Sequence, residues 1–419
     1  MKKNKKFIAV MLVVTLAIIT FTGCTAGNED LMDAIKKTSS MKSYETNASV
    51  KLDVSFDNLQ LPSQEAQNMA MVLNMLKNIE ANINQKVVQN EDLTKFKAES
   101  TLDYTLGGLG VKLNLWHDYD WSGDNFKMLQ VMEVPGILSG TLAQVNPELM
   151  GKKYMVYDYS DYDKMLDGQD AETMEKTEEF MKEFMQNFMT KFQQSSLELL
   201  EDYEKDFDFD KKLVTYKGKE KVNEEKVSVY ELKLDDKTAK EYLRYSVNYI
   251  LDKEDLKDSI KDYLNMIKDM VYNLDSENMT KEEMDEEINQ MLNSFDVAML
   301  KDKFNSFMDK IEDIQFVGDE GIVMNFHVNK DGYVVSQSGT MDIVIDMDKL
   351  EETFNKLENN IGTTDEQLPT LNLDIEYNSN ITNINGDIEI KLPELTDENS
   401  FSQFDLMMPQ PQYQNNMLQ

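Results

Sequence analysis

The sequence predicts an α+β fold in which long amphipathic helices cover one face of a curved antiparallel β-sheet. Apolar and polar residues alternate with the period of half-buried strands in two regions, about 44–158 and 211–392. The period becomes helical at about 172–203 and 236–310. We therefore expect one sheet with two helical insertions. An internal duplication or a second domain is the alternative, although no residue-by-residue repeat is visible.

The N-terminus has the pattern of an export signal. Residues 2–6 contain four lysines, and residues 7–21 form an apolar run interrupted only by two threonines. Such a run suits the hydrophobic region of a signal peptide and is short for a membrane span, which needs about 20 residues. We expect residues 1–23 to be the signal peptide and residues 24–28 to be a short tether.

The end of this segment, Phe21-Thr22-Gly23-Cys24, resembles the bacterial lipobox, although that motif prefers Leu where this chain has Phe21. The resemblance implies that Cys24 receives a lipid, such as a palmitate chain, and becomes the first residue of the mature protein. Cys24 is the only cysteine of the chain, and acylation accounts for it. The alternative is an ordinary secretory signal that happens to contain a cysteine.

The first sheet region begins with a short helix, because apolar residues fall on one side of residues 29–41. Strict alternation over residues 48–56 predicts the first strand, and Pro62-Ser63 opens a helical stretch of about 18 residues. Glycine-rich turns then separate the strands of an antiparallel meander with one dry and one wet face. These strands are expected at residues 96–104, 111–115 and 126–131.

The helical stretch at 172–203 carries a wide apolar stripe in which Phe and Met each recur every four residues. Methionine is unbranched and polarisable, so it suits a deformable apolar binding site. Ordinary core packing is the alternative for this stripe. If helices lie over the dry face of the sheet with a cavity between them, the candidate cavity residues are Met181, Phe184, Met185, Phe188, Met189 and Phe192.

The second sheet region is expected to contain two strands around a Lys217-Gly218 turn, followed by three helices within residues 236–310 with a break near Asp252. Asp331-Gly332 and Asn385-Gly386 are strong hairpin signals. The second hairpin would lead into a strand at residues 388–392. A short helix is expected at residues 350–357, and residues 396–419 are expected to form a disordered tail.

The charge balance excludes some partners. The chain has 43 basic and 78 acidic residues and a formal net charge of −35. Nucleic acid is therefore a poor partner, because phosphate contacts need clustered Lys and Arg. The same charge opposes lying flat on anionic lipid. Arg244 is the only arginine, which removes most options for bidentate clamps on phosphate or carboxylate groups.

The search for catalytic or metal-binding motifs returns little. The two histidines, His117 and His327, lie in separate strand patterns, and no zinc-ligand spacing, nucleophile elbow or phosphate loop occurs. Residues 118–123 begin like a calcium loop, but Leu129 stands where an EF-hand needs Glu, so a hairpin turn is favoured. We therefore predict no catalytic residue, no metal ligand and no cofactor.

Acidic residues interleaved with aromatic residues recur at two places, 158–163 and 202–210. Solvated loops or helix ends are the favoured interpretation, with a cation or glycan site as the alternative. A hydrolase of envelope polymers would need two carboxylates at a defined separation, and the sequence specifies no such pair.

Several segments resemble the LolA and mycobacterial LppX-like lipoprotein superfamily and uncharacterised lipoproteins of Gram-positive bacteria. They are residues 41–45 leading into the first strand, the successive meander strands, residues 328–333 and residues 383–393. The resemblance covers residues 29–395 and implies a half-barrel of antiparallel strands with a helical lid around an apolar cavity. The long helical stretches depart from a simple carrier. No functional residue transfers, because the superfamily has no motif here.

These observations together predict a non-enzymatic lipoprotein, anchored to the outer face of the cell membrane through Cys24, that binds or carries an apolar, lipid-like ligand. The alternative is a structural or interaction lipoprotein of the cell envelope, with a solid core and an acidic face for a protein or cell-wall partner.

Overall fold

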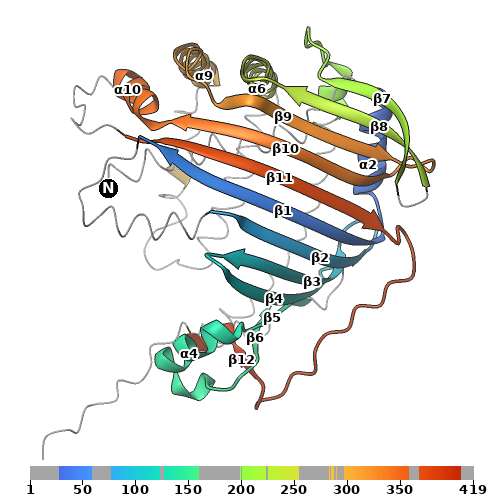
Figure 1. Ribbon diagram of the computed structural model, residues 1–419. Coiled ribbons are helices and arrows are strands. Elements are labelled where there is room, and N and C mark those ends of the chain that lie inside the picture. The colour runs from blue at the N-terminus through green and yellow to red at the C-terminus, as the bar shows by residue number, and fades with distance from the viewer. Residues whose placement is uncertain are drawn as a thin grey trace, which may run out of the picture.

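A computed structural model gives the fold of most of the chain (Figure 1). Cys24, the signal peptide and the candidate cavity residues between 181 and 192 lie outside the residues that it describes. The described residues are 28–58, 77–122, 127–159, 201–222, 225–253, 297–357 and 368–406, with a few isolated helical positions between residues 199 and 289.

Twelve strands form one continuous sheet in the order β12-β6-β5-β4-β3-β2-β1-β11-β10-β9-β8-β7. Neighbouring strands are antiparallel except β12 and β6, which are parallel. The strands are β1 (Ser43–Asp57), β2 (Ile79–Gln89), β3 (Lys95–Leu106), β4 (Leu109–Asp120), β5 (Lys127–Glu133), β6 (Tyr154–Asp158), β7 (Val214–Val222), β8 (Glu225–Leu234), β9 (Val317–Val328), β10 (Val334–Asp346), β11 (Thr370–Thr382) and β12 (Ser400–Ser402).

The sheet consists of two meanders joined side by side. Strands β1 to β6 are called the N-terminal half below, and β7 to β11 the C-terminal half. Within each half, consecutive strands are neighbours, and β1 pairs with β11 along nearly its whole length. Each half is also contacted by an element from the other end of the chain. The N-terminal helix packs against β9 and β10 of the C-terminal half, and β12 pairs with β6 of the N-terminal half.

The described helices are short and contact mainly the C-terminal half. Figure 1 shows α6, α9 and α10 in a row beside its strands, and α2 contacts β9 and β10. The longest helix in the described part of the chain, α6, has 16 residues. The helices are α2 (Glu29–Ser39), α4 (Gly136–Val145), α6 (Asp236–Leu251), α9 (Val297–Lys310) and α10 (Met347–Leu357), with 3-10 turns at Pro147–Leu149 and Gln403–Leu406.

The prediction of an antiparallel half-barrel covered by long amphipathic helices is therefore wrong. The molecule is mostly a large mixed sheet with short helices. Within residues 236–310 the structure describes two helices, α6 (Asp236–Leu251) and α9 (Val297–Lys310). Helical periodicity identifies the apolar face of a helix and does not show which strands that face covers.

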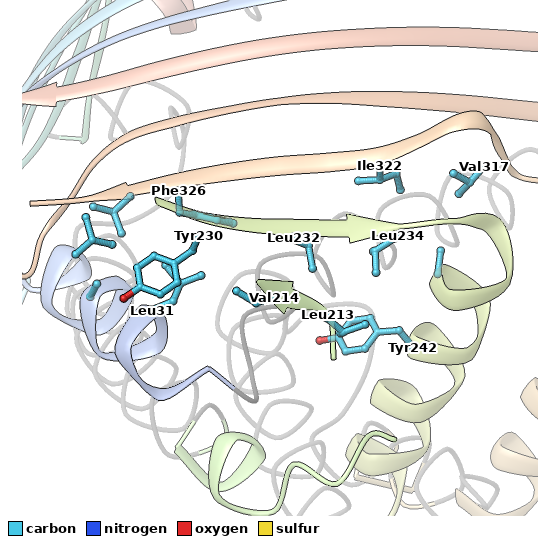
Figure 2. Packing of buried hydrophobic residues seen from close by; sticks show 14 residues of the cluster. Leu31, Leu213, Val214, Tyr230, Leu232, Leu234, Tyr242, Val317, Ile322 and Phe326 are labelled. Atoms are coloured by element: carbon cyan, nitrogen blue, oxygen red, sulfur yellow. The ribbon is translucent and has the colours of Figure 1, made fainter. Parts of the chain in front are cut away.

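The largest described core lies where α2 and α6 meet the C-terminal half. Figure 2 shows Leu31 of α2 and Tyr242 of α6 converging on β8, where Leu232 and Leu234 are fully buried. Asn28 caps α2, because its side-chain Oδ1 accepts a hydrogen bond of 3.1 Å from the Leu31 amide. Burial of each large apolar side chain stabilises the fold by roughly 1.5–3 kcal/mol.

Local signals predicted several elements correctly. The short helix expected at 29–41 is α2, and the break expected near Asp252 is the C-cap of α6. The Asp331-Gly332 hairpin connects β9 to β10, and the helix expected at 350–357 lies within α10.

Other local predictions are wrong. Strand β2 was not foreseen, and the expected Lys217-Gly218 turn is instead a bulge inside β7. Gly218 adopts a φ of 110° there, which glycine tolerates without strain. Residues 388–392 have the predicted alternation but no strand partner in the described part of the chain. The predicted tail is ordered at its start, since β12 and the turn Gln403–Leu406 lie within it.

Candidate functional site

The two faces of the sheet differ in chemistry, and each carries a candidate site. On the polar face, a pocket of about 370 Å3 lies over β9, β10, β11, β1 and β2. Its described lining contains carboxylates, one lysine, one amide and one hydroxyl group as polar side chains. The polar residues of this lining are Lys51, Asp53, Asn78, Glu80, Glu320, Thr340, Asp342, Asp374 and Glu376.

Three aspartates form a row across the floor of this pocket. Asp374 on β11 lies directly opposite Asp53 on β1 and directly opposite Asp342 on β10. Side chains of opposed residues share one face of a sheet and lie about 5 Å apart at Cβ. Like charges in such positions repel each other, so the row concentrates negative charge and weakens the sheet locally.

The acidic residues of the pocket differ in their hydrogen-bond and ion-pair partners. Asp342 Oδ2 accepts a 3.0 Å hydrogen bond from the Glu320 amide, and Gly318 leaves the space that the Asp342 carboxylate occupies, since a Cβ there would collide with it. Lys51 Nζ lies 3.6 Å from Glu376 Oε2 and is exposed. Within the described part of the chain, Asp53 and Asp374 have no such cationic partner.

This acidic row does not form a metal site by geometry. The described residues contain no group of three or more His, Cys, Asp or Glu side chains arranged to hold a metal ion. The pocket is therefore a negatively charged basin whose carboxylates attract cations or basic groups without fixed coordination.

The apolar face lies on the other side of the same strands. Two cross-strand rows near its centre mix small and bulky residues. One row runs from Gly339 across Tyr377 and Val50 to Ala81. The neighbouring row places Ser379, Ala48 and Ile83 side by side. Figure 1 shows α6, α9 and α10 away from β2, β3 and β4. The residues of this strip are half-buried, and Gly339 is fully buried.

Tyr377 places a buried polar group on this apolar face. Its hydroxyl is shielded from solvent and has no hydrogen-bond partner in the described part of the chain. Its ring lies over Gly339, where a Cβ would approach Tyr377 Cε1 to 2.7 Å. Burial raises the pKa of Tyr377 to about 12, so the hydroxyl stays a neutral donor at physiological pH. An unsatisfied buried hydroxyl costs about 1–3 kcal/mol.

An aromatic cluster lies on the same face at the far end of β3 and β4. Phe96, His117, Tyr119 and Trp121 contact one another in sequence, with ring centroids 5.5–6.4 Å apart. His117 Nδ1 lies 2.9 Å from the Tyr119 hydroxyl, and desolvation lowers the pKa of His117. This histidine is therefore held neutral within an apolar patch, which fits a packing role.

The calcium-like segment contains two structural acids. Asp118 is buried on β4, where its Oδ2 lies 2.5 Å from Lys127 Nζ and 3.2 Å from Lys97 Nζ. Asp120 caps the end of β4, because its Oδ1 accepts hydrogen bonds from the amide and hydroxyl of Ser122. The Ser122 hydroxyl, together with Lys95, lowers the pKa of Asp120 to about 2.

The structure separates the other residues that the sequence singled out. His327 on β9 lies 2.8 Å from Glu220, far along the sheet from His117 on β4. Asp202 and Asp206 both face Lys253 at the end of α6. Asp161, Asp163, Cys24 and the six candidate cavity residues, Met181, Phe184, Met185, Phe188, Met189 and Phe192, lie outside the described residues.

Sequence reasoning missed the aspartate row and Tyr377. Each of these residues sits in an ordinary strand alternation, and only the pairing of β1 with β11 and of β11 with β10 reveals the row. A residue's cross-strand neighbours cannot be read from local periodicity, because register is set by distant parts of the chain.

Comparison with protein families and with curated proteins does not assign this chain to a class. A scan against family models returns no match, and a search of curated proteins returns none. None of the helices in the described ranges has the length and hydropathy that crossing a bilayer requires.

Proposed function

We propose that this chain is a non-enzymatic lipoprotein, exported and anchored to the outer face of the cell membrane through Cys24, that binds an apolar ligand on the apolar face of its sheet. The signal-peptide pattern and the cysteine at its end support the anchoring. The anchor would hold the sheet near the membrane, where apolar ligands such as lipids are concentrated.

The observation that carries the ligand proposal is the buried, unpartnered hydroxyl of Tyr377 within a half-buried apolar strip. Binding sites for small molecules are mostly apolar with a few placed polar groups that set orientation. A ligand with an apolar chain and one hydrogen-bond acceptor satisfies both features. Its chain would lie along Val50, Ala81 and Ile83, and its acceptor would take the Tyr377 proton.

Native mass spectrometry of the mature lipoprotein, extracted from membranes, tests this proposal directly. We expect an acylated N-terminus at Cys24 and a stoichiometric apolar passenger that organic solvent releases. A mature protein that carries no passenger and takes up neither fatty acid nor phospholipid would overturn the ligand proposal. An unmodified Cys24 would overturn the anchor.

A substitution separates specific ligand binding from non-specific hydrophobic binding. Tyr377→Phe should weaken binding of a fatty acid by about tenfold, because a hydrogen bond to the ligand is lost. Binding of an uncharged hydrocarbon dye should be unchanged. Tyr216→Phe, at an exposed tyrosine of edge strand β7 that packs against Tyr230 and is far from Tyr377 in the sheet order, is the matched control and should alter neither affinity.

The acidic pocket favours a second candidate function, an interaction lipoprotein whose acidic face binds a basic partner. Its motivation is the row Asp342, Asp374 and Asp53 at the pocket floor. Such binding would weaken steeply with salt, whereas binding on the apolar face would not. Pull-down from an envelope extract at low and high salt, with Asp53→Asn as the comparison, separates the two functions.

A further inference from the structure

One end of the N-terminal half exposes large apolar side chains from two separate segments. The turn from β3 to β4 exposes Leu109 by 55%. The connection from β5 to β6 exposes Ile137 by 60%, Leu138 by 46% and Met150 by 74%. Exposed apolar groups that gather at one place on a protein surface mark an interaction site.

The strand register places both segments at the same end of the sheet. Strand β5 ends at Glu133, whose carboxylate accepts a 2.7 Å hydrogen bond from Asn114 Nδ2 on β4. Strand β4 begins further out, at Leu109, so its turn with β3 lies on the side to which β5 runs. Figure 1 shows α4 at this end of the sheet, apart from the other helices. Residues 107–110 and 136–150 are called the apolar tip below.

Helix α4 is apolar on more than one side. Leu142 packs inward against a small core cluster, yet Ile137 and Leu138 are exposed. No charged residue occurs in residues 134–147. The other exposed residues of α4 are uncharged, namely Gly136, Gly140, Thr141 and Gln144. A surface helix normally turns a charged face to water, whereas a helix that is apolar all round belongs in an apolar environment.

The apolar tip is neutral on a strongly acidic molecule. Residues 103–112 and 133–153, which include its flanks, contain three acidic residues and three lysines, whereas the whole chain carries a net charge of −35. Lys112 and Lys153 are exposed at the margin of the tip. An anionic bilayer repels an acidic protein surface and attracts exposed lysines, so the tip can approach lipid where the rest of the chain is repelled.

We propose that the apolar tip contacts the membrane, with Leu109, Ile137, Leu138 and Met150 inserted where the lipid headgroups meet the acyl chains. The inference rests on the proposed anchoring, which keeps the tip within reach of the bilayer. The ten residues of α4 span about 15 Å, roughly half the thickness of the hydrocarbon core. This helix therefore lies in the interface and does not cross the bilayer.

A bilayer fits the tip better than a protein partner does. Protein interfaces surround their apolar centre with a polar rim and with hydrogen bonds that select the partner. The four exposed side chains stand among glycines and other uncharged residues, which provide no such selection. Neutral charge, exposed apolar groups and marginal lysines are together the properties of a lipid-contacting surface.

Contact at the tip would also orient the protein. A single acyl chain holds a protein to a bilayer only marginally, and stable attachment takes a second signal. The tether leads to α2, which packs against β9 and β10 in the other half of the sheet. The tip is thus a second and separate attachment, which determines the end of the sheet that faces the lipid.

Quenching by lipid tests this contact on the full-length chain. Ile137→Cys and Leu300→Cys each provide one thiol for a fluorophore at an exposed helical position. Leu300 is the matched control, because it lies on α9 beside Lys301 and Asp302. Vesicles of phosphatidylcholine and phosphatidylglycerol with brominated acyl chains should lower the emission from position 137 about twofold, since insertion reaches roughly 5–10 Å into the interface. Emission from position 300 should change little.

A charge in the tip provides a second measurement. In the Ile137→Cys background, Leu138→Asp should reduce the quenching at position 137 to the level of position 300, because a carboxylate opposes insertion. Met299→Asp, at an exposed position of α9, should leave this quenching unchanged. Unchanged circular dichroism of both variants would show that the fold is intact. Wild-type protein treated with the fluorophore in parallel reports any reaction at Cys24.

Equal quenching at positions 137 and 300 would overturn the proposal. A disulfide-linked homodimer of unlabelled Ile137→Cys, without quenching of the labelled form, would also overturn it and would show that a second copy covers the tip. Mass spectrometry of Cys24 on the same samples separates this inference from the anchor. Quenching at position 137 without an acyl group would reject the anchor alone, and an acyl group without quenching would reject the tip alone.

Discussion

The two halves of the sheet have similar strands but different surroundings. In the C-terminal half, Leu232, Leu234 and Ile322 are fully buried beneath α2 and α6. In the N-terminal half, Ile83 and Leu102 in the middle of β2 and β3 are only half-buried, and full burial on the same face is reached further along these strands, at Val87 and Ala98. Both halves alternate apolar and polar residues equally well. Helix packing, and not the strand pattern, therefore decides which face becomes a solid core.

Buried polar groups show the same difference. The core beneath α6 satisfies its buried hydroxyl groups, because the Tyr203 hydroxyl lies 3.1 Å from the Tyr242 hydroxyl and 2.8 Å from Ser246 Oγ. On β11, where the two halves meet, the Tyr377 hydroxyl is buried without a partner among the described residues. A satisfied network rigidifies a core, whereas an unsatisfied group marks a place where a further partner would stabilise the fold. This difference suggests that the two halves divide stability and binding between them.

The largest expected effect comes from truncating one leucine in each half. Leu232→Ala should lower the free energy of unfolding by about 3 kcal/mol, because it leaves a cavity in a fully buried site. Leu102→Ala should cost about 1 kcal/mol, since its side chain is already half-exposed and removes less area from water. Urea unfolding followed by circular dichroism measures both. Equal costs would mean that the halves do not differ in packing.

A smaller effect of opposite sign is expected in the acidic pocket. Asp374→Asn should raise the free energy of unfolding by about 0.5 kcal/mol at low salt, because it removes like-charge repulsion with Asp53 and Asp342. Added salt should reduce this gain. Asp57→Asn is the matched control on β1, since Asp57 lies opposite Thr370 and accepts a hydrogen bond from Asn372. A stabilisation that is independent of salt would contradict the electrostatic explanation.

The smallest effect concerns His117, a half-buried histidine of the N-terminal half. Because desolvation lowers its pKa, the folded protein binds its proton less readily than the unfolded chain does. Stability should therefore decrease as pH falls from about 6.5 towards the folded pKa of this group, and level off below it.

Nuclear magnetic resonance can follow this titration residue by residue, because the chain has only two histidines. Substitution of His327 by Asn assigns the signals. A His117 midpoint above 6.5 would show that the aromatic cluster does not desolvate the ring. It would also show that this end of the apolar face is more open to water than its contacts indicate.

Local elements were largely readable from the sequence. The alternation in β1, β3 and β11 and the Asp331-Gly332 turn depend on neighbouring residues, so periodicity and turn chemistry suffice to predict them. Strand β2 was missed because its inward face mixes Ile83 with small and polar residues, which blurs the alternation.

The arrangement of elements could not be read in the same way. The aspartate row exists only because Asp53 pairs with a strand at the other end of the chain, and no local signal encodes that register. The helical cover was overestimated because a stripe of apolar residues does not show which strands of the sheet a helix packs against. The anchor at Cys24 and the Met and Phe stripe lie outside the described residues, so both remain predictions from the sequence.

The position of β1 between β2 and β11 has a consequence for the order of assembly. Its partner residues on β11, such as Thr382 opposite Glu45, lie roughly 340 residues away along the chain. A chain that leaves its point of synthesis from the N-terminus can close β1 through β6 early, but the seam between β1 and β11 must wait for almost the whole polypeptide. Until then the long flank of β1 is an exposed edge, and the slowest and most aggregation-prone step of folding is the closing of this seam.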